Sequence, residues 1–282
     1  MSGTPRPSLR PSLRPSLRDV IARHGLAPRK ALGQHFLLDE NICARIAAAA
    51  GDLNGRHVLE VGPGPGGLTR ALLATPLASL LACELDTRAV AALAELDEPR
   101  LTVLQQDALK LDAVAALPAH RQVVANLPYN VGTPLLIGWL RQAGQWERLT
   151  LMFQQEVAER ICAAPDTEHY GRLAVLSQWL CRCTVLMHLP PGAFFPPPRV
   201  HSAVVGLVPH AAQPTPDLLA AMERLTAAAF GQRRKMLRGS LKTLGDPEAL
   251  LARCHIAAER RAETLSITEF DGLARALLER DT

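Results

Sequence analysis

The sequence has no apolar run of the length, about 18 residues, that a membrane-spanning helix needs. Its first residues also lack the apolar core of a secretory signal, so we expect a cytoplasmic protein with no membrane partner. The 6 cysteines include no Cys-x-x-Cys pair and no Cys/His pair at zinc spacing. We therefore expect free thiols and no metal site.

What is present is enough for a globular core. The chain has 282 residues, of which 48% are hydrophobic and 21% are charged. This length predicts one large domain or two smaller ones, with no need for disulfides. The net charge of +4 permits a polyanionic partner without demanding one. Clustering of that charge is more informative than its sum.

The N-terminal segment is the first such cluster. Residues 6–17 are three tandem copies of Arg-Pro-Ser-Leu, and residues 1–18 hold four arginines and no acid. Regular proline prevents helix formation, so the sequence predicts a disordered basic arm over residues 1–27. Contact with RNA is one interpretation of this arm. We favour the simpler one, a tail without a set role, because spaced arginines are a weak signal.

The next part of the chain alternates short apolar strands with helices. Strands are predicted at residues 58–61, 80–85, 101–107, 122–127 and 149–154, and helices at residues 41–50, 68–74 and 88–96. This order is typical of an α/β fold, in which helices cover both faces of a parallel sheet. Ligands in such sheets bind at the carboxyl ends of the strands.

A change of pattern follows residue 207. A proline-rich linker at 209–217 leads to segments that we expect to be only helical, over residues 217–230, 232–243, 247–254 and 266–280. The last opens with Ser-x-x-Glu, a capping box. We therefore predict an α/β domain over residues 28–207 and a small helical domain over residues 208–282.

A glycine loop follows the first predicted parallel strand. Gly62, Gly64 and Gly67 satisfy G-x-G-x-x-G, and Glu84 ends the next strand. Such glycines let a ligand approach the backbone, and such an acid binds ribose hydroxyls, so a nucleoside-containing cofactor is expected. The absence of GK[ST] excludes a P-loop. NAD, S-adenosylmethionine and a turn without any ligand stay open at this point.

Two further polar positions end strands. Asp107 could accept a hydrogen bond from an adenine amino group, although alone it would more often cap a helix. Asn126-Leu127-Pro128-Tyr129 ends the fourth strand. An exocyclic adenine amine has two N–H donors and a delocalised lone pair. The side-chain carbonyl of Asn126 and the main-chain carbonyl of Leu127 could hold both donors and free that lone pair.

The other two residues of this motif suit the same purpose. Pro128 forces Leu127 into an extended conformation, which can aim its carbonyl. Tyr129 offers a flat face on which a base can stack. The alternative is a proline turn with a capping asparagine and a packed tyrosine. The position after a glycine loop and two acids at strand ends favours the chemical interpretation.

The ordered motifs VLEVGPGPGGLT, CELD, QQDA, NLPYN and FFPPPRVHSAVV resemble the bacterial 16S ribosomal RNA adenine dimethyltransferases. KALGQHFLLD upstream and FGQRRKMLRGSL downstream resemble the same family, so the resemblance spans about residues 28–280. It implies a Rossmann-like class I methyltransferase domain followed by a helical domain. It also implies transfer of methyl groups from S-adenosylmethionine to N6 of two adjacent adenosines near the 3′ end of 16S rRNA, within the pre-30S subunit.

The resemblance also implies roles for individual residues. Phe194 would stack on the target base opposite Tyr129, and the Asn126–Tyr129 motif would hold that base. The residues implied at the cofactor are His35, Leu37, Gly62, Gly64, Glu84, Asp107 and Asn126. We expect a monomer.

A second basic cluster lies in the predicted helix over residues 232–243. Its cations are Arg233, Arg234, Lys235, Arg238 and Lys242, with no acid among residues 231–242. Spacing by four places Arg234, Arg238 and Lys242 on one face. A merely solvated face is the usual interpretation of such a run, but with an RNA substrate we expect phosphate contacts.

Three other functions share parts of this pattern. An NAD-dependent oxidoreductase would need a hydride-handling His, Ser or Tyr-x-x-x-Lys set, which does not follow the glycine loop. A ribosome-assembly factor could keep the fold without the chemistry, but the intact Asn126 and Tyr129 argue against that loss. A large-subunit rRNA methylase of the antibiotic-resistance type would share most motifs.

Overall fold

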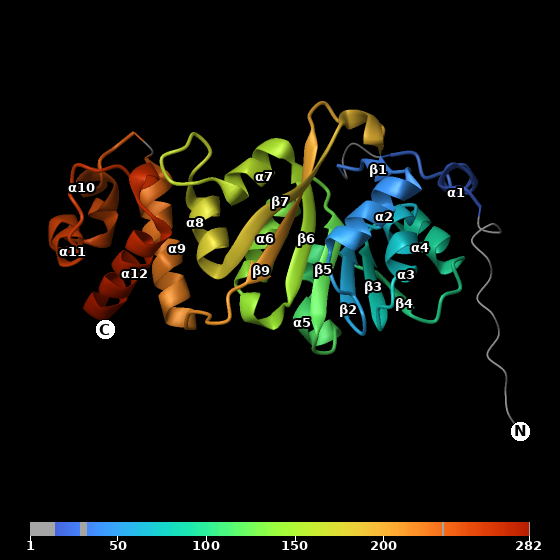
Figure 1. Cartoon of the computed structure of the whole chain (residues 1–282), viewed down its shortest axis with the longest axis horizontal. Helices are drawn as coiled ribbons and strands as arrows, with labels where there is room; N and C mark the ends of the chain where they lie inside the picture. The colour runs from blue at the N-terminus through green and yellow to red at the C-terminus, as the bar shows by residue number, and fades with distance from the viewer. Residues whose placement is uncertain (1–14, 29–32, 233, 282) are drawn as a thin grey trace, which may run out of the picture.

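The computed structural model of the chain describes residues 15–28, 33–232 and 234–281. Its centre is a 7-stranded sheet in the order β4-β3-β2-β5-β6-β9-β7 (Figure 1). The parallel strands are β2 (His57–Val61), β3 (Ser79–Glu84), β4 (Leu101–Gln105), β5 (Arg121–Asn126) and β6 (Arg148–Gln154). All five were predicted from the sequence, with bounds that differ by at most two residues.

Two strands at the other edge were not predicted. β9 (Ser202–Pro209) runs antiparallel to β6, and β7 (Cys181–Leu189) runs antiparallel to β9. The sheet is therefore mixed, and the expectation of a purely parallel sheet is wrong at this edge. β9 is apolar and buried because it lies between two strands, whereas the edge strand β7 is only partly covered. Figure 1 shows both strands crossing the middle of the molecule.

Helices cover both faces of the sheet, as predicted. Neighbouring strand residues point to opposite faces, so Val58 and Val124 pack on one side while Leu59 and Val123 pack on the other. The helices of this half are α2 (Glu40–Ala49), α3 (Gly67–Leu73), α4 (Thr87–Ala94), α5 (Ala113–Ala116), α6 (Gly132–Leu140), α7 (Gln155–Cys162) and α8 (Arg172–Leu180). Short 3-10 turns are η3 (Ala108–Lys110), η4 (Ala143–Gln145) and η5 (Pro191–Ala193).

The N-terminal segment begins its ordered structure earlier than predicted. Helix α1 (Leu17–Arg23) starts at a capping box in which Ser16 and Asp19 bond each other's backbone. Leu17 and Val20 are each only 3% exposed, and Val20 packs on α4. The arm predicted over residues 1–27 is therefore too long, because the last Ser-Leu repeat supplies a helix cap. Residues 1–14 lie outside the described part of the chain.

A separate ribbon of two short strands lies beside the main sheet. β1 (Phe36–Leu37) pairs with β8 (Phe194–Phe195), so that Phe36 lies opposite Phe195 and Leu37 opposite Phe194. This pairing brings the segment before α2 next to the proline-rich segment between β7 and β9. In the described part of the chain, no helix is both long enough and apolar enough to cross a bilayer.

The C-terminal helices share a core of their own. They are α9 (Pro216–Gly231), α10 (Leu237–Ser240), η6 (Leu241–Leu244), α11 (Pro247–Arg253), η7 (Ala262–Thr264) and α12 (Ile267–Asp281). The predicted capping box is present, since Ser266 Oγ accepts from the Glu269 amide at 3.2 Å. This core also contains Tyr170 and Leu176, which precede β7. A domain boundary near residue 208 thus stays a prediction.

The predicted helix over residues 232–243 is wrong. α9 ends at Gly231, and α10 comprises only Leu237–Ser240 before η6. The Leu237 and Arg238 amides donate to the carbonyls of Arg260 and Ala258, at 2.8 and 3.1 Å. In a continuous helix these amides would donate to carbonyls four residues earlier in the chain. Here they donate to a distant loop instead, so α9 does not continue into α10. Local pattern alone does not reveal such a long-range partner.

Candidate active site

A pocket of about 1020 Å³, its open mouth included, lies at the carboxyl ends of β2, β3, β4 and β5. This is the edge of the sheet at which α/β proteins bind ligands. The pocket wall comprises residues 33–37, the glycine loop, the ends of β3 and β4, and residues 126–131. The structure therefore brings together His35, Leu37, Gly62, Gly64, Glu84, Asp107 and Asn126, as the sequence predicted.

The glycine loop leaves no room for side chains. Gly64 has φ +54°, and a Cβ there would meet the Phe36 ring at 2.8 Å. A Cβ on Gly67 would lie 2.6 Å from the main-chain oxygen of Leu37. The loop and β1 thus pack backbone against backbone, and both line the pocket. Glycine is required here for the approach of β1 as well as for the shape of the pocket wall.

Glu84 is held by the backbone around it. One carboxylate oxygen accepts from the Gly64 amide at 3.1 Å, and the other accepts from the Leu85 and Asp86 amides at 2.8 and 2.9 Å. Burial nevertheless raises its pKa above the ordinary value. A carboxylate has about four acceptor positions, so the oxygen bonded to Gly64 can accept from a ligand hydroxyl. Glu84 is thus a buried acceptor on the pocket wall, and its binding to a ribose stays a prediction.

A second buried acid, Glu60, was not predicted. It lines the pocket from β2, is 1% exposed, and accepts from the Thr69 hydroxyl at 2.7 Å. Burial, with a smaller effect of the Glu84 charge, raises the pKa of Glu60 to about 8. The signal was present in the sequence, because an acid inside a buried apolar strand needs an explanation.

Asp107 caps a 3-10 turn and also lines the pocket, and its role as an acceptor for an adenine amino group stays a prediction. One oxygen caps η3 by accepting from the Leu109 amide at 3.0 Å, and the residue lines the pocket. Two large apolar side chains lie on the pocket wall beside the acids. Leu85 is 54% exposed and Leu109 is 50% exposed. Exposed leucines within a pocket are suited to contact a flat apolar ring.

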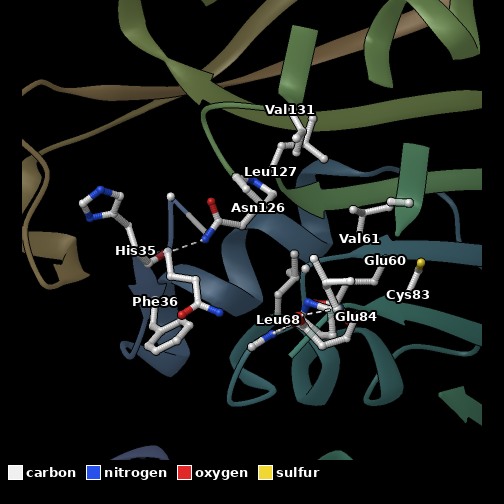
Figure 2. Close-up of a pocket in the computed structure, with 18 of the residues that line it drawn as sticks. His35, Phe36, Glu60, Val61, Leu68, Cys83, Glu84, Asn126, Leu127 and Val131 are labelled. Carbon is white, nitrogen blue, oxygen red and sulfur yellow. Dashed lines mark hydrogen bonds between the residues drawn. The ribbon is translucent and has the colours of Figure 1, made fainter. Parts of the chain in front are cut away.

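Asn126 has its amide oriented by a main-chain partner. Its Nδ2 donates to the carbonyl of His35 at 3.0 Å, as Figure 2 shows. Because a carbonyl can only accept, Nδ2 must be the atom on that side and Oδ1 lies on the other. Within the described ranges, no donor bonds Asn126 Oδ1 or the carbonyl of Leu127. Two acceptors at the end of β5 therefore remain for a ligand.

Tyr129 is fixed from two sides. A hydrogen bond of 2.6 Å joins its hydroxyl to Ser202 at the start of β9. Its ring centroid lies 5.3 Å from that of His35, at an interplanar angle of 30°. The His35 ring in turn donates through Nδ1 to the carbonyl of Pro196 at 2.8 Å. Burial raises the pKa of Tyr129, which keeps the phenol neutral. Its half-buried ring lines the pocket.

Phe194 lies beside the pocket wall without being part of it. It is 5% exposed, packs in the core with Leu37, and is absent from the pocket wall. In the β1–β8 ribbon, opposite residues share a face. Phe194 thus follows Leu37 into the core, while Phe195, opposite Phe36, is 43% exposed. Phe194 pairs with Leu37, which lines the pocket, so its stacking on the base opposite Tyr129 stays a prediction.

The basic cluster is exposed but lies apart from the pocket. Arg234, Lys235, Arg238 and Lys242 are all solvent-exposed, and Arg233 lies outside the described residues. Arg238 also approaches Glu259, at 3.8 Å. Figure 1 places α10 at the opposite end of the long axis from β1. The predicted common helical face does not exist, because Arg234 precedes α10.

The 6 cysteines are free, as predicted. Cys43, Cys83 and Cys181 are buried, while the other three are partly covered. Burial raises the pKa of the Cys43 thiol to about 12 and that of Cys83 to about 11. These thiols are therefore protonated near neutral pH and are poor nucleophiles.

Comparison with known proteins agrees with this geometry. The model of the ribosomal RNA adenine dimethylase family matches residues 25–277. The ribosomal RNA small subunit methyltransferase A of Gluconobacter oxydans is 64% identical over 91% of this chain and 85% of its own. That of Paramagnetospirillum magneticum is 53% identical over 92% and 93% of the two chains.

Solved structures show the same fold. A dimethyladenosine transferase from Plasmodium falciparum superposes with a TM-score of 0.74 at 24% identity, over 85% of this chain and 96% of that one. The 23S rRNA methyltransferase ErmE gives a TM-score of 0.66 at 26% identity, over 86% and 99%. The expected Rossmann-like class I methyltransferase fold is thereby confirmed, and the chain belongs to the ribosomal RNA adenine dimethylase family.

Proposed function

We propose that the protein transfers methyl groups from S-adenosylmethionine to N6 of two adjacent adenosines near the 3′ end of 16S rRNA, giving N6,N6-dimethyladenosine. The observation that carries the proposal is the orientation of Asn126. Its Nδ2 is taken by the His35 carbonyl, which leaves Oδ1 as an acceptor beside the pocket. Membership of the adenine dimethylase family supports the same chemistry.

The pocket fits S-adenosylmethionine by its shape and its acids. Gly64 and Gly67 let β1 pack closely on the glycine loop, and both segments form the wall against which the cofactor would lie. Glu84 would accept from the ribose hydroxyls, and Asp107 would accept from the adenine amino group. Leu85 and Leu109 would contact the faces of the adenine ring. When bound, the cofactor supplies an electrophilic methyl group on a sulfonium.

The acceptors at the end of β5 would prepare the target amine. Asn126 Oδ1 and the Leu127 carbonyl would accept its two N–H groups, while Tyr129 would stack on the base. Holding both hydrogens favours a pyramidal nitrogen, whose lone pair is then available for the methyl carbon. With the cofactor bound, the N–C bond would form as the methyl–sulfur bond breaks, and the amine would afterwards lose one proton to water. Positioning and electrostatics carry this reaction.

A second candidate is methylation of large-subunit RNA. ErmE, a 23S rRNA methyltransferase, shares the fold at 26% identity. The small-subunit assignment is favoured because relatives at 64% and 53% identity are small-subunit methyltransferases. An assembly factor without chemistry is disfavoured by the complete set of acceptors.

Binding of the subunit would involve the basic cluster. Arg234, Lys235, Arg238 and Lys242 are exposed and could contact phosphates far from the pocket; Arg233 would belong with them. The pre-30S particle as substrate, a monomeric enzyme and a cytoplasmic location complete the proposal. They rest on the family and on the basic surface.

The test is a methylation assay on purified subunits from a strain that lacks these methyl groups. Small and large subunits are incubated separately with the protein and S-adenosylmethionine. Dimethylation blocks base pairing, so reverse transcription should stop at two adjacent adenosines near the 3′ end of 16S rRNA. The Asn126→Ala variant serves as the inactive control. Stops on large-subunit RNA, or no stop on either RNA, would reject the proposal.

A further inference from the structure

A small exposed surface adjoins the pocket on the segment between β8 and β9. Phe195 is 43% exposed, and Arg199 and His201 are exposed on the same segment. We call these three residues the rim. Large aromatic side chains are scarce in this chain, at 4% of its residues. Phe195 is an exposed aromatic beside the pocket, where its flat face is open to a base.

The rim is attached to the pocket by two bonds. The carbonyl of Pro196 accepts from the His35 ring at 2.8 Å, and Ser202 bonds the Tyr129 hydroxyl at 2.6 Å. Both His35 and Tyr129 line the pocket. The residues from 195 to 201 are thus held between two fixed points on the pocket wall. Their position relative to a bound base is set by the fold.

The direction of Phe195 follows from the β1–β8 pairing. Phe195 lies opposite Phe36, whose ring lines the pocket, and opposite residues have Cβ atoms about 4.5–5.5 Å apart on one face. Phe195 itself is not part of the pocket wall. Phe195 therefore adjoins the pocket wall through Phe36, while its own exposed side chain lies outside the cavity. A base inside the pocket would meet Tyr129, and a base beside it would meet Phe195.

We infer that the rim binds the nucleotide next to the target adenosine, with Phe195 stacking on its base and Arg199 contacting its phosphate. The inference rests on the proposed RNA methylation. A base that leaves its helix deprives its neighbour of a stacking partner, and an exposed aromatic ring replaces that partner. Arg199 is exposed and, among the described residues, no ion pair involves it, so its charge is available to a phosphate. The occupant is single-stranded RNA, which stacks on aromatics and carries the complementary charge.

The experiment measures methylation kinetics on unmethylated small subunits for Phe195→Ala, Phe195→Leu and Phe195→Trp. Loss of base stacking should raise KM for the subunit by about 5- to 150-fold in Phe195→Ala. Phe195→Leu keeps size and apolarity but loses the aromatic face, so it should resemble Phe195→Ala. Phe195→Trp should restore the wild-type KM. The affinity for S-adenosylmethionine is measured by calorimetry and should stay unchanged. An unchanged affinity would show that the variants are folded.

Two further variants sharpen the result. Val200→Ala removes a neighbouring apolar side chain that is 45% exposed, and it should change KM less than twofold. Arg199→Gln should lower the log–log salt slope of subunit binding by about 0.7. A wild-type KM in Phe195→Ala, or full activity of Phe195→Leu, would overturn the inference. Methylation by the wild-type protein tests the proposed function. If the wild type did not methylate small subunits, the proposed function would be rejected, whereas the variants test only the role of the rim.

Discussion

Gly67→Ala tests the backbone contact between the glycine loop and β1. The added Cβ would lie 2.6 Å from the Leu37 oxygen, 3.2 Å from Leu17 Cδ1 and 3.3 Å from Cys43 Sγ. The first contact is with backbone and cannot be relieved by a rotamer change. Overpacking of this kind costs about 1–3 kcal/mol of unfolding free energy. At about 2–4 °C per kcal/mol, the melting temperature should fall by about 2–12 °C.

The assay is thermal unfolding, with and without S-adenosylmethionine. Displacement of β1 deforms the pocket wall, so the variant should also gain less stability from the cofactor than the wild type does. Gly138→Ala in α6 and Gly272→Ala in α12 are matched controls, because a Cβ at either glycine meets no atom within 4 Å. Both should be stabilised by about 0.5–1 kcal/mol. A Gly67→Ala protein with wild-type melting and cofactor affinity would refute the claim that this contact restricts the site.

Three other changes test the chemistry, the buried acid and the RNA surface. Asn126→Ala should lower kcat for methyl transfer by about 10²–10³-fold while leaving subunit affinity within a few-fold. Cofactor affinity is measured separately. Turnover at the wild-type rate would show that Asn126 takes no part in the reaction. Glu60 is protonated more readily in the folded protein, with its pKa raised from 4.5 to about 8. Its contribution to stability is therefore fully present below pH 4.5 and is lost as the pH rises toward 8. Glu60→Gln should consequently gain stability relative to the wild type between these values in urea unfolding, and a difference independent of pH would contradict this. Replacing Arg234, Arg238 and Lys242 together by Gln should lower the log–log salt slope of subunit binding by up to about 0.9 for each lost phosphate contact, and an unchanged slope would leave these residues as a solvated surface.

The sequence predicted the part of the fold in which local pattern and tertiary structure agree. Strands β2, β3 and β5, which end at or just before Gly62, Glu84 and Asn126, are short and buried on both faces, so their apolar runs are visible without a partner. The edge strand β4, which precedes Asp107, is only partly buried. Parallel order then brings their ends together, which is why the pocket could be anticipated from spacing. Glu60 is the exception, because its importance follows from burial rather than from a motif.

The remaining errors come from long-range contacts. Nothing in the local pattern shows that Leu237 donates to the Arg260 carbonyl, and this bond replaces the expected helix. Phe194 and Phe195 are identical in type, so only the register with β1 determines which one is buried. Ser16 was obscured by the prolines of the repeat, although its bond with Asp19 starts α1.

His35 is hydrogen-bonded both to Asn126 in the pocket and to Pro196 beside the rim. Its carbonyl orients the Asn126 amide, and its ring bonds the Pro196 carbonyl beside the rim. If the proposed RNA contact moved this segment, the Asn126 acceptor would be affected through His35. Such coupling is reciprocal: the factor by which RNA changes the affinity for S-adenosylmethionine must equal the factor by which S-adenosylmethionine changes the affinity for RNA. The two orders of binding would then lead to the ternary complex with the same total free energy.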